Sequence, residues 1–178
     1  GSAKSTYASV VAPCWYLGTR PEARVILASY GDDLARRHGR RTRQLISQPE
    51  TAAILQCELQ ADSRAADAFG LTNGSEYIAC GVMGGITGNR AHGIVIDDPI
   101  KGRQEAESET IRDKSWSAYI DDFCSRLIPG SPQVLIQTRW HEDDIAGRIL
   151  PENWDGESGM IDGRDGRRWK VICLPAIA

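Results

Sequence analysis

The segment Gly93-Ile94-Val95-Ile96-Asp97-Asp98-Pro99 has the composition of a fully buried parallel strand that ends in two adjacent carboxylates. Unpaired negative charge is costly to bury, so a positive group must balance Asp97 and Asp98. Ligands of α/β sheets bind beyond the carboxyl ends of the strands, where this pair is expected to lie. The alternative is that Asp98 simply caps a turn before Pro99.

Other apolar runs and helical patterns flank this segment. Strands are predicted at residues 25–28, 77–82 and 134–136, and helices at 5–17, from Asp32-Asp33 toward Ile46, and at 105–127. Pro13 should kink the first helix or end it early. The helix over 105–127 should pack one apolar face and stop at Pro129-Gly130. Short apolar strands that alternate with helices specify an α/β domain with a mainly parallel β-sheet flanked by helices.

Two regions have less regular patterns. Residues 51–72 alternate poorly and are predicted to form a helix or an irregular excursion, with a strand near 53–59. The tail is rich in Gly and Asp over residues 154–166, and a last strand is predicted at 168–174, so a small C-terminal β-hairpin should turn at Asp165-Gly166. We expect one domain over residues 1–178.

Composition limits the classes of function. Lys and Arg total 21 and Asp and Glu total 24, for a net charge of −3, so any DNA contact must come from a local basic patch. The five cysteines are scattered singly, which argues against a zinc site or a disulfide framework and favours a reducing cytosol. No apolar run approaches the roughly 20 residues of a membrane span, so no membrane association is expected.

The N-terminal run Gly1-Ser2-Ala3-Lys4-Ser5-Thr6 matches the end of the phosphate-loop pattern GxxxxGK[ST], with Ala3 where the last Gly usually stands. In that pattern, Lys4 reaches the β and γ oxygens of ATP, and Ser5 gives its hydroxyl to Mg²⁺. The helix that follows directs its positive end at the phosphates. An alternative is that Gly1 and Ser2 are foreign to the natural protein, which would make the match accidental.

Two further patterns carry polar or basic groups. Residues 134–141 read as another buried strand with a polar end, where Gln137 or Thr138 could hydrogen-bond the γ-phosphate or the attacking water. The dense basic tract at residues 36–43 places Arg36, Arg40 and Arg43 on one helical face that could grip a DNA backbone. The alternatives are ordinary polar caps at the strand end and a solvated helix face.

Two runs together, GITGNRAHGIVIDDPI at residues 85–100 and QTRWHEDDIAGR at residues 137–148, resemble the large terminase subunits of tailed bacteriophages. The resemblance covers essentially the whole chain. It implies a P-loop NTPase of the additional-strand, catalytic-acid type, which uses ATP and Mg²⁺ to drive double-stranded DNA into a procapsid. It also implies a portal protein and a small terminase subunit as partners, a homo-oligomeric ring, and the cytoplasm of an infected or lysogenic bacterial host.

Position by position, the resemblance assigns Lys4 and Ser5 to the Walker A motif and Asp97 to the metal-binding aspartate of the Walker B motif. Asp98 takes the place of the catalytic carboxylate, which is often Glu in these motors, and Thr138 matches the coupling motif. The whole run from Gly1 to Thr6 is then expected to cradle the phosphates.

The resemblance also implies an arginine that approaches the nucleotide in cis or from a neighbouring subunit. Arg90 is the first candidate, and Arg126 and Arg139 are rivals. The sequence begins inside the phosphate loop and stops before any nuclease-type acidic cluster. We therefore expect a fragment in which residues 151–178 start the connection to a nuclease domain, and we expect no nuclease activity in it. The rival functions are a helicase-like or recombination ATPase of the same fold, and a non-catalytic assembly or binding fragment.

Overall fold

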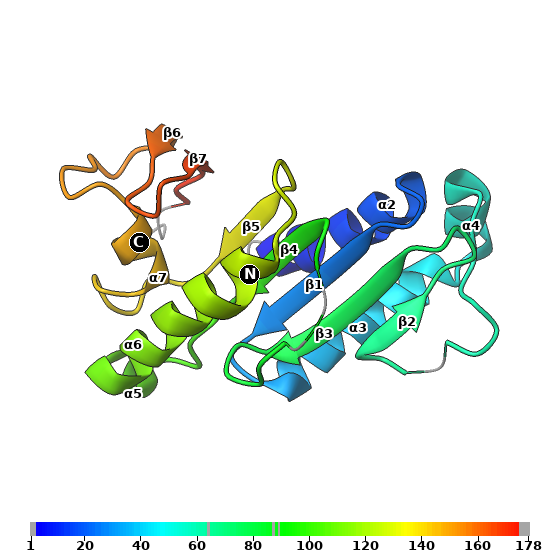
Figure 1. Cartoon of the computed structure of the whole chain (residues 1–178), viewed down its shortest axis with the longest axis horizontal. Coiled ribbons are helices and arrows are strands. Elements are labelled where there is room, and N and C mark those ends of the chain that lie inside the picture. Colours follow the sequence, from blue (N-terminus) through cyan, green and yellow to red (C-terminus); the bar gives the residue numbers. More distant parts are fainter. Residues whose placement is uncertain (1–2, 64, 87, 89, 175–178) are drawn as a thin grey trace.

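The computed structural model describes residues 3–63, 65–86, 88 and 90–174. At its centre is a five-stranded sheet with the strand order β2-β3-β1-β4-β5 (Figure 1). The neighbours β3, β1, β4 and β5 run parallel, and β2 pairs antiparallel with β3 at one edge. The strands are β1 (Arg24–Ser29), β2 (Ala68–Gly70), β3 (Glu76–Gly81), β4 (Gly93–Asp97) and β5 (Gln133–Ile136).

The middle of the sheet is apolar because helices cover both of its faces. Every residue of β4 is buried, as is β1 from Val25 to Ser29. The predicted strands at 25–28, 77–82, 93–96 and 134–136 are confirmed, with ends shifted by at most one residue. The pairing of β1 with β4 places Ser29 beside Asp97, so the two strands end together.

A long irregular helix begins the described chain. It consists of α1 (Lys4–Thr6), the π-helical turn η1 (Tyr7–Val11) and α2 (Ala12–Thr19), which follow one another without a break. The prediction that Pro13 could end this helix is wrong. Pro13 lacks the N–H that would normally reach the Ser9 carbonyl, and the Thr42 hydroxyl lies 3.4 Å from that oxygen instead.

The same face of the sheet carries α3 (Asp32–Ile46) and α4 (Pro49–Leu55), and Figure 1 shows α2, α3 and α4 behind the strands. The predicted strand near 53–59 is wrong, because Pro49 starts a helix there. The short strand β2 was not predicted. Fully buried residues of the core between these helices and the sheet include Leu17, Leu27, Ala35, Ile46 and Tyr77.

The opposite face carries α5 (Arg103–Ala106), α6 (Glu109–Ser117), the π-helical turn η2 (Ala118–Phe123) and the short 3₁₀ helix η3 (Cys124–Arg126). The prediction of one helix over 105–127 is wrong at Ser108, which is extended and caps α6 by accepting the Ile111 N–H at 3.4 Å. The predicted apolar face is confirmed. This face packs into the core on the second side of the sheet. Its residues are Trp116, Tyr119, Ile120, Phe123 and Leu127.

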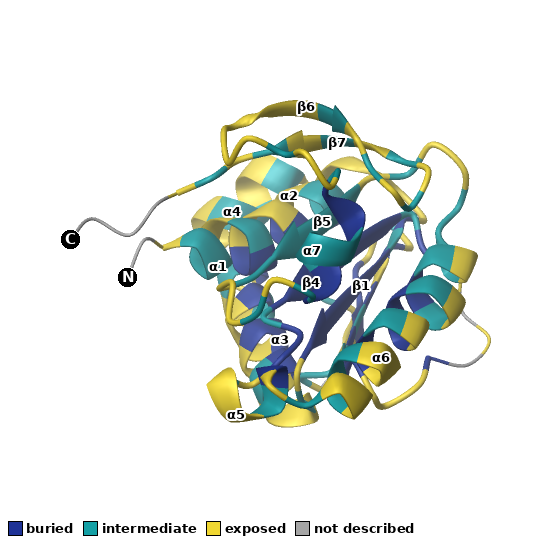
Figure 2. Ribbon diagram, turned by 90° about the vertical axis from the view of Figure 1, so that its left-hand side faces the viewer, coloured by how far each residue is buried: buried dark blue, intermediate teal, exposed yellow. Residues whose placement is uncertain are grey.

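The chain ends with α7 (Ile145–Ile149) and a hairpin of β6 (Gly159–Asp162) and β7 (Arg168–Val171). The hairpin confirms the predicted turn at Asp165-Gly166, where Gly166 has a φ of 78°. Figure 2 shows this hairpin at the edge of the molecule, with the buried strands of the main sheet between two layers of helices.

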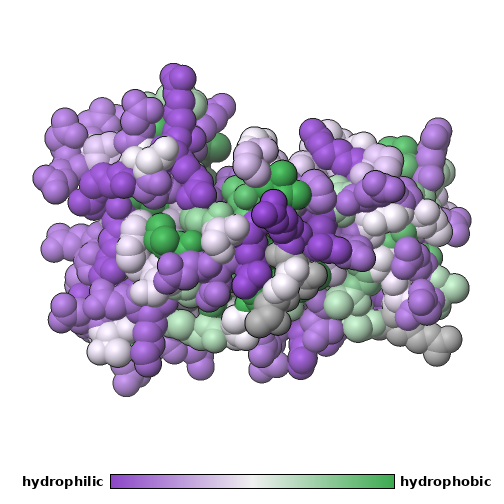
Figure 3. All heavy atoms as spheres, in the orientation of Figure 1, coloured by the Kyte–Doolittle hydropathy of each residue, from purple (hydrophilic) through white to green (hydrophobic). Residues whose placement is uncertain are grey.

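On the face shown in Figure 3, hydrophobic residues appear as small patches among hydrophilic ones. Within the described ranges, no helix is both long and apolar enough to cross a membrane.

Candidate functional site

Asp97 ends β4 and is almost completely buried, with 1% of its surface exposed. The Ser5 hydroxyl donates to Asp97 Oδ1 at 3.1 Å, and the Ser9 hydroxyl donates to Oδ2 at 2.6 Å. His38 Nε2 lies 3.3 Å from Oδ2. The N-terminal helix, β4 and α3 therefore meet at one carboxylate.

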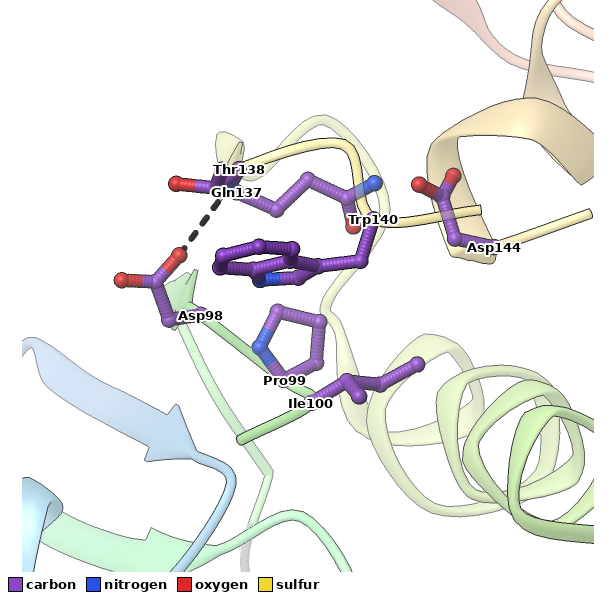
Figure 4. A pocket seen from close by; sticks show the side chains of 7 residues that line it. All are labelled: Asp98, Pro99, Ile100, Gln137, Thr138, Trp140 and Asp144. Atoms are coloured by element: carbon purple, nitrogen blue, oxygen red, sulfur yellow. Dashed lines mark hydrogen bonds between the residues drawn. The ribbon is translucent and has the colours of Figure 1, made fainter. Parts of the chain in front are cut away.

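Asp98 leaves the strand in a left-handed backbone conformation, with a φ of 47°. Its N–H donates to the Ile136 carbonyl at 2.8 Å, and its carbonyl accepts the Tyr30 N–H at 3.0 Å. Its carboxylate accepts the Thr138 N–H at 3.1 Å, as Figure 4 shows. The simple turn cap before Pro99 is thus not what holds this side chain, because its partner comes from the end of β5.

The charge of Asp98 is tuned by its surroundings. Burial raises the pKa of this carboxyl above its ordinary value of 3.8, and the negative charge of Asp97 acts in the same direction. The Thr138 N–H and the positive charge of Lys4 oppose the rise in pKa. A carboxylate with a raised pKa beside a cation is a common arrangement at catalytic sites.

The start of the N-terminal helix lies beside the two carboxylates. Ala3 precedes it with a φ of 54°, a conformation that glycine adopts without strain, so the physical reason for a Gly at this position of the phosphate-loop pattern applies here. Thr6, also predicted for the loop, accepts a hydrogen bond from Arg41 of α3 at 3.1 Å. Gly1 and Ser2 lie outside the described residues.

A small hollow opens beside Asp98, between the ends of β4 and β5 (Figure 4). Its volume is about 10 Å³, roughly what a single water needs, so it cannot hold a nucleotide. Thr138 lies here as predicted, but it is exposed and contacts Asp98 through its backbone N–H. The amide of Gln137 is buried, and neither its nitrogen nor its oxygen has a partner in the described part of the chain. The lining residues are Asp98, Pro99, Ile100, Gln137, Thr138, Trp140 and Asp144.

Two of the three candidate arginines, Arg90 and Arg126, lie away from this site within one chain. Arg90 is exposed, and its carbonyl lies 3.5 Å from Arg24, the first residue of β1, so it sits at the end of the sheet opposite Asp97. Arg126 lies at that same end, where its carbonyl accepts the Ala91 N–H. Arg139 is tied to Asp144 at 2.7 Å.

The arginines predicted for DNA contact have different environments. Arg36 is paired with Asp67 at 3.0 Å, and Arg43 is half-buried, with its Nε buried and unpartnered among the described atoms. Arg40 is exposed. These three side chains do not form one uniformly exposed cationic face, and their contact with DNA stays a prediction.

Sequence reasoning missed Ser9 and His38, which both contact Asp97. A signal for each was present. Ser9 follows Ser5 by four residues, so the two share a helical face. His38 lies within the basic tract, but it falls on the same face of α3 as the buried Ala35, Thr42 and Ile46. Burial lowers the pKa of His38 below its ordinary value of 6.5, although the neighbouring Asp97 carboxylate opposes this effect.

Comparison with known proteins adds to this geometry. Residues 1–176 match the family described as "Terminase large subunit, T4likevirus-type, N-terminal". The chain belongs to this terminase family. No curated protein is similar enough in sequence to count as a match.

The fold agrees with this membership in the terminase family. The large terminase of bacteriophage HK97 aligns with a TM-score of 0.54 and 13% identity, over 86% of this chain and 34% of that one. The large terminase of a thermophilic bacteriophage in complex with ATP-γ-S aligns with a TM-score of 0.39 and 15% identity, over 76% of this chain and 31% of that one, which is too weak to support an argument. The chain thus spans about a third of the length of these terminases. At such identities the likeness shows the fold: a mostly parallel sheet flanked by helices, with a small hairpin.

Proposed function

We propose that this chain binds ATP with Mg²⁺ between the start of the N-terminal helix and the end of β4, and that it hydrolyses the nucleotide. The observation that carries the proposal is the hydrogen bond from Ser5 to Asp97, because it joins the helix start to the strand end. These residues are 92 positions apart in sequence. The same region holds Lys4, whose charge acts on Asp98.

The residues present suit a magnesium ion that is shared with phosphates. No three His, Cys, Asp or Glu side chains gather as a metal site in the described ranges. Mg²⁺ is commonly held by one or two carboxylates together with substrate phosphates, so a full protein cage is not required. Ser5 and Asp97 would hold it here. When bound, such an ion offsets the negative charge that develops on the phosphate oxygens.

The other residues have separable roles in the proposed reaction. Lys4 and the helix N-terminus bind the phosphates by charge and by free N–H groups. Asp98 orients the attacking water and accepts its proton, a task for which a raised pKa is suited. The Thr138 N–H fixes the Asp98 carboxylate and so links the end of β5 to the reacting group.

Membership of the terminase family supports a wider role for this ATPase. We propose that hydrolysis drives double-stranded DNA into a procapsid, with a portal protein and a small terminase subunit as partners. In a homo-oligomeric ring, an arginine such as Arg90 would reach the nucleotide of the neighbouring subunit. The work would take place in the cytoplasm of an infected or lysogenic bacterium.

The test is ATP hydrolysis by the intact protein, compared with Asp97→Ala and Lys4→Ala. Phosphoryl transfer depends almost wholly on positioning and charge stabilisation, so we expect each substitution to reduce turnover by about a hundredfold or more. Steady-state phosphate release at saturating Mg²⁺ and ATP measures the effect.

Matched controls are Asp162→Ala and Lys170→Ala, which remove the same charges from exposed positions on the β6–β7 hairpin. Both should retain normal turnover. Normal hydrolysis by Lys4→Ala would show that the phosphate-binding residues lie elsewhere.

A further inference from the structure

Two groups outside the phosphate-loop pattern contact Asp97 Oδ2, while Ser5 occupies Oδ1. One is the hydroxyl of Ser9 in the π-helical turn, at 2.6 Å. The other is the imidazole of His38 on α3, with Nε2 at 3.3 Å. One carboxylate oxygen is therefore constrained from two elements, and the other faces the start of the N-terminal helix.

The environment of His38 argues for more than a packing role. The residue is 4% exposed, and its Nδ1 is buried without a hydrogen-bond partner in the described part of the molecule. A buried histidine that serves only the core normally satisfies both ring nitrogens. Here the contact with Asp97 is the polar interaction that offsets the burial of the ring. A neutral ring with its proton on Nε2 leaves only an acceptor, Nδ1, unpaired.

The position of His38 is fixed closely by its neighbours. Gly39 follows His38, and a Cβ added there would lie 2.0 Å from the Ala66 carbonyl oxygen. The backbone of α3 therefore packs closely against the backbone at Ala66. One turn further along, Thr42 bonds the His38 carbonyl at 3.0 Å. The ring therefore has little freedom to move away from Asp97.

We propose that His38, together with Ser9, is a positioning residue for the metal-binding aspartate. With its Nε2 3.3 Å from Oδ2, His38 fixes the rotation of the Asp97 carboxylate so that Oδ1 faces Ser5 and the Mg²⁺ position. This role rests on the proposed function, because it assigns the metal to Asp97. Groups that orient a metal ligand typically change metal affinity or activity by about 10-fold to 100-fold when they are removed.

The test compares His38→Leu, which removes the donor at similar volume, with His38→Gln, whose amide nitrogen can reach the position of Nε2. Binding of ADP to the intact protein is measured by calorimetry without metal and over a Mg²⁺ titration. We expect His38→Leu to raise the Mg²⁺ concentration needed for half-maximal enhancement of ADP binding by about 10-fold. Affinity for metal-free ADP should stay unchanged, and His38→Gln should restore most of the Mg²⁺ response.

Two further variants guard against a purely structural effect. Ser9→Ala removes the second donor to Oδ2 with a small change in volume, and it should shift the Mg²⁺ response in the same direction even if His38→Leu does not fold. Ile46→Val alters a buried residue of α3 two turns from His38 and should lower stability without shifting the Mg²⁺ response.

The outcomes separate the two proposals. An unchanged Mg²⁺ response in His38→Leu or Ser9→Ala, or an equal loss of ADP affinity with and without metal, would overturn the role of His38 and leave the proposed function standing. If Mg²⁺ did not enhance ADP binding in the unsubstituted protein, the proposed function would fall and the role of His38 with it.

Discussion

At the residue scale, the backbone conformation and the burial of Asp98 both lower the stability of the folded protein. Its left-handed backbone and its partly buried charge each oppose folding. Its carboxylate nevertheless has a fixed direction, because it accepts the Thr138 N–H from the end of β5. Residues at functional sites often lower the stability of the fold in this way, because activity requires their conformation or charge.

Replacing Asp98 with Asn should therefore stabilise the protein at neutral pH while abolishing hydrolysis. Because burial raises the pKa of Asp98 in the folded state, its ionised form destabilises the native protein. This penalty disappears as the pH falls through the raised pKa toward the ordinary value of 3.8. Urea unfolding of both proteins without nucleotide, from about pH 8 to pH 4, measures the difference. A stability gap that widened in acid would contradict this account.

At the scale of elements, ion pairs attach α7 and the segment before it to α6. The Asp143 carboxylate forms ion pairs with Arg112 at 3.1 Å and with Arg148 at 2.7 Å. Arg148 forms a second ion pair with Asp113 at 2.6 Å. Asp144 caps α7 by accepting the Gly147 N–H at 2.8 Å. These contacts fix the chain just after the polar end of β5, next to the candidate site.

Asp143→Asn should lower the stability of the protein at neutral pH. The hydrogen bonds from Arg148, supported by Arg112, hold the pKa of Asp143 well below its ordinary value of 3.8. The stabilisation is therefore present above about pH 4 and is lost as the pH falls through the lowered pKa. Because the carboxylate is 42% exposed, we expect a loss of no more than about 1 kcal/mol.

Urea denaturation at pH 7 and in acid, at low and high salt, measures this effect. Asp113→Asn is the matched control, since that carboxylate is 58% exposed and has Arg148 as its partner, so its loss should cost less. An equal effect of Asp143→Asn at every pH would show that the charge is not responsible.

At the scale of the whole molecule, a buried carboxylate joins the C-terminal hairpin to the helical layer. Tyr119 of η2 donates its hydroxyl to Asp165 at 2.6 Å, and Trp169 of β7 donates its indole N–H to the same carboxylate at 3.1 Å. The Asp165 side chain has no exposed surface. The hairpin is therefore fixed to the main domain by polar contacts that water does not reach.

Tyr119→Phe should destabilise the protein, because it leaves the buried Asp165 with one donor fewer. The expected loss is about 1–3 kcal/mol, since a hydrogen bond to a buried charged group is removed. Thermal unfolding followed by circular dichroism measures it. Tyr7→Phe is the control, because Tyr7 is 69% exposed. The free energy of unfolding of this variant should differ from that of the unsubstituted protein by less than about 0.5 kcal/mol. Equal melting temperatures for the two variants would argue against the attachment.

Much of the fold follows from local sequence patterns. The apolar runs at 25–28, 93–96 and 134–136 predicted strands because a short strand covered on both faces is apolar throughout. The break at Ser108 was missed, and the helix α4 was only one of the two alternatives predicted for its region, for a different reason. A serine at an N-cap and a proline at the first position of a helix change the backbone direction within one residue. The spacing of apolar residues on either side does not reveal that change.

The sequence by itself determined the residue types of the site: a carboxylate pair after a buried strand, and a lysine and serine ahead of a helix. Only the tertiary structure decided which of them meet. Ser5 and Ser9 reach Asp97 from the N-terminal helix and His38 reaches it from α3, while Arg90 lies at the far end of the sheet. Parallel strands bring their carboxyl ends to one edge, and a loop that precedes a strand is left at the other. Because α3 packs against the N-terminal helix, His38, one residue of the basic tract, lies in contact with the buried Asp97.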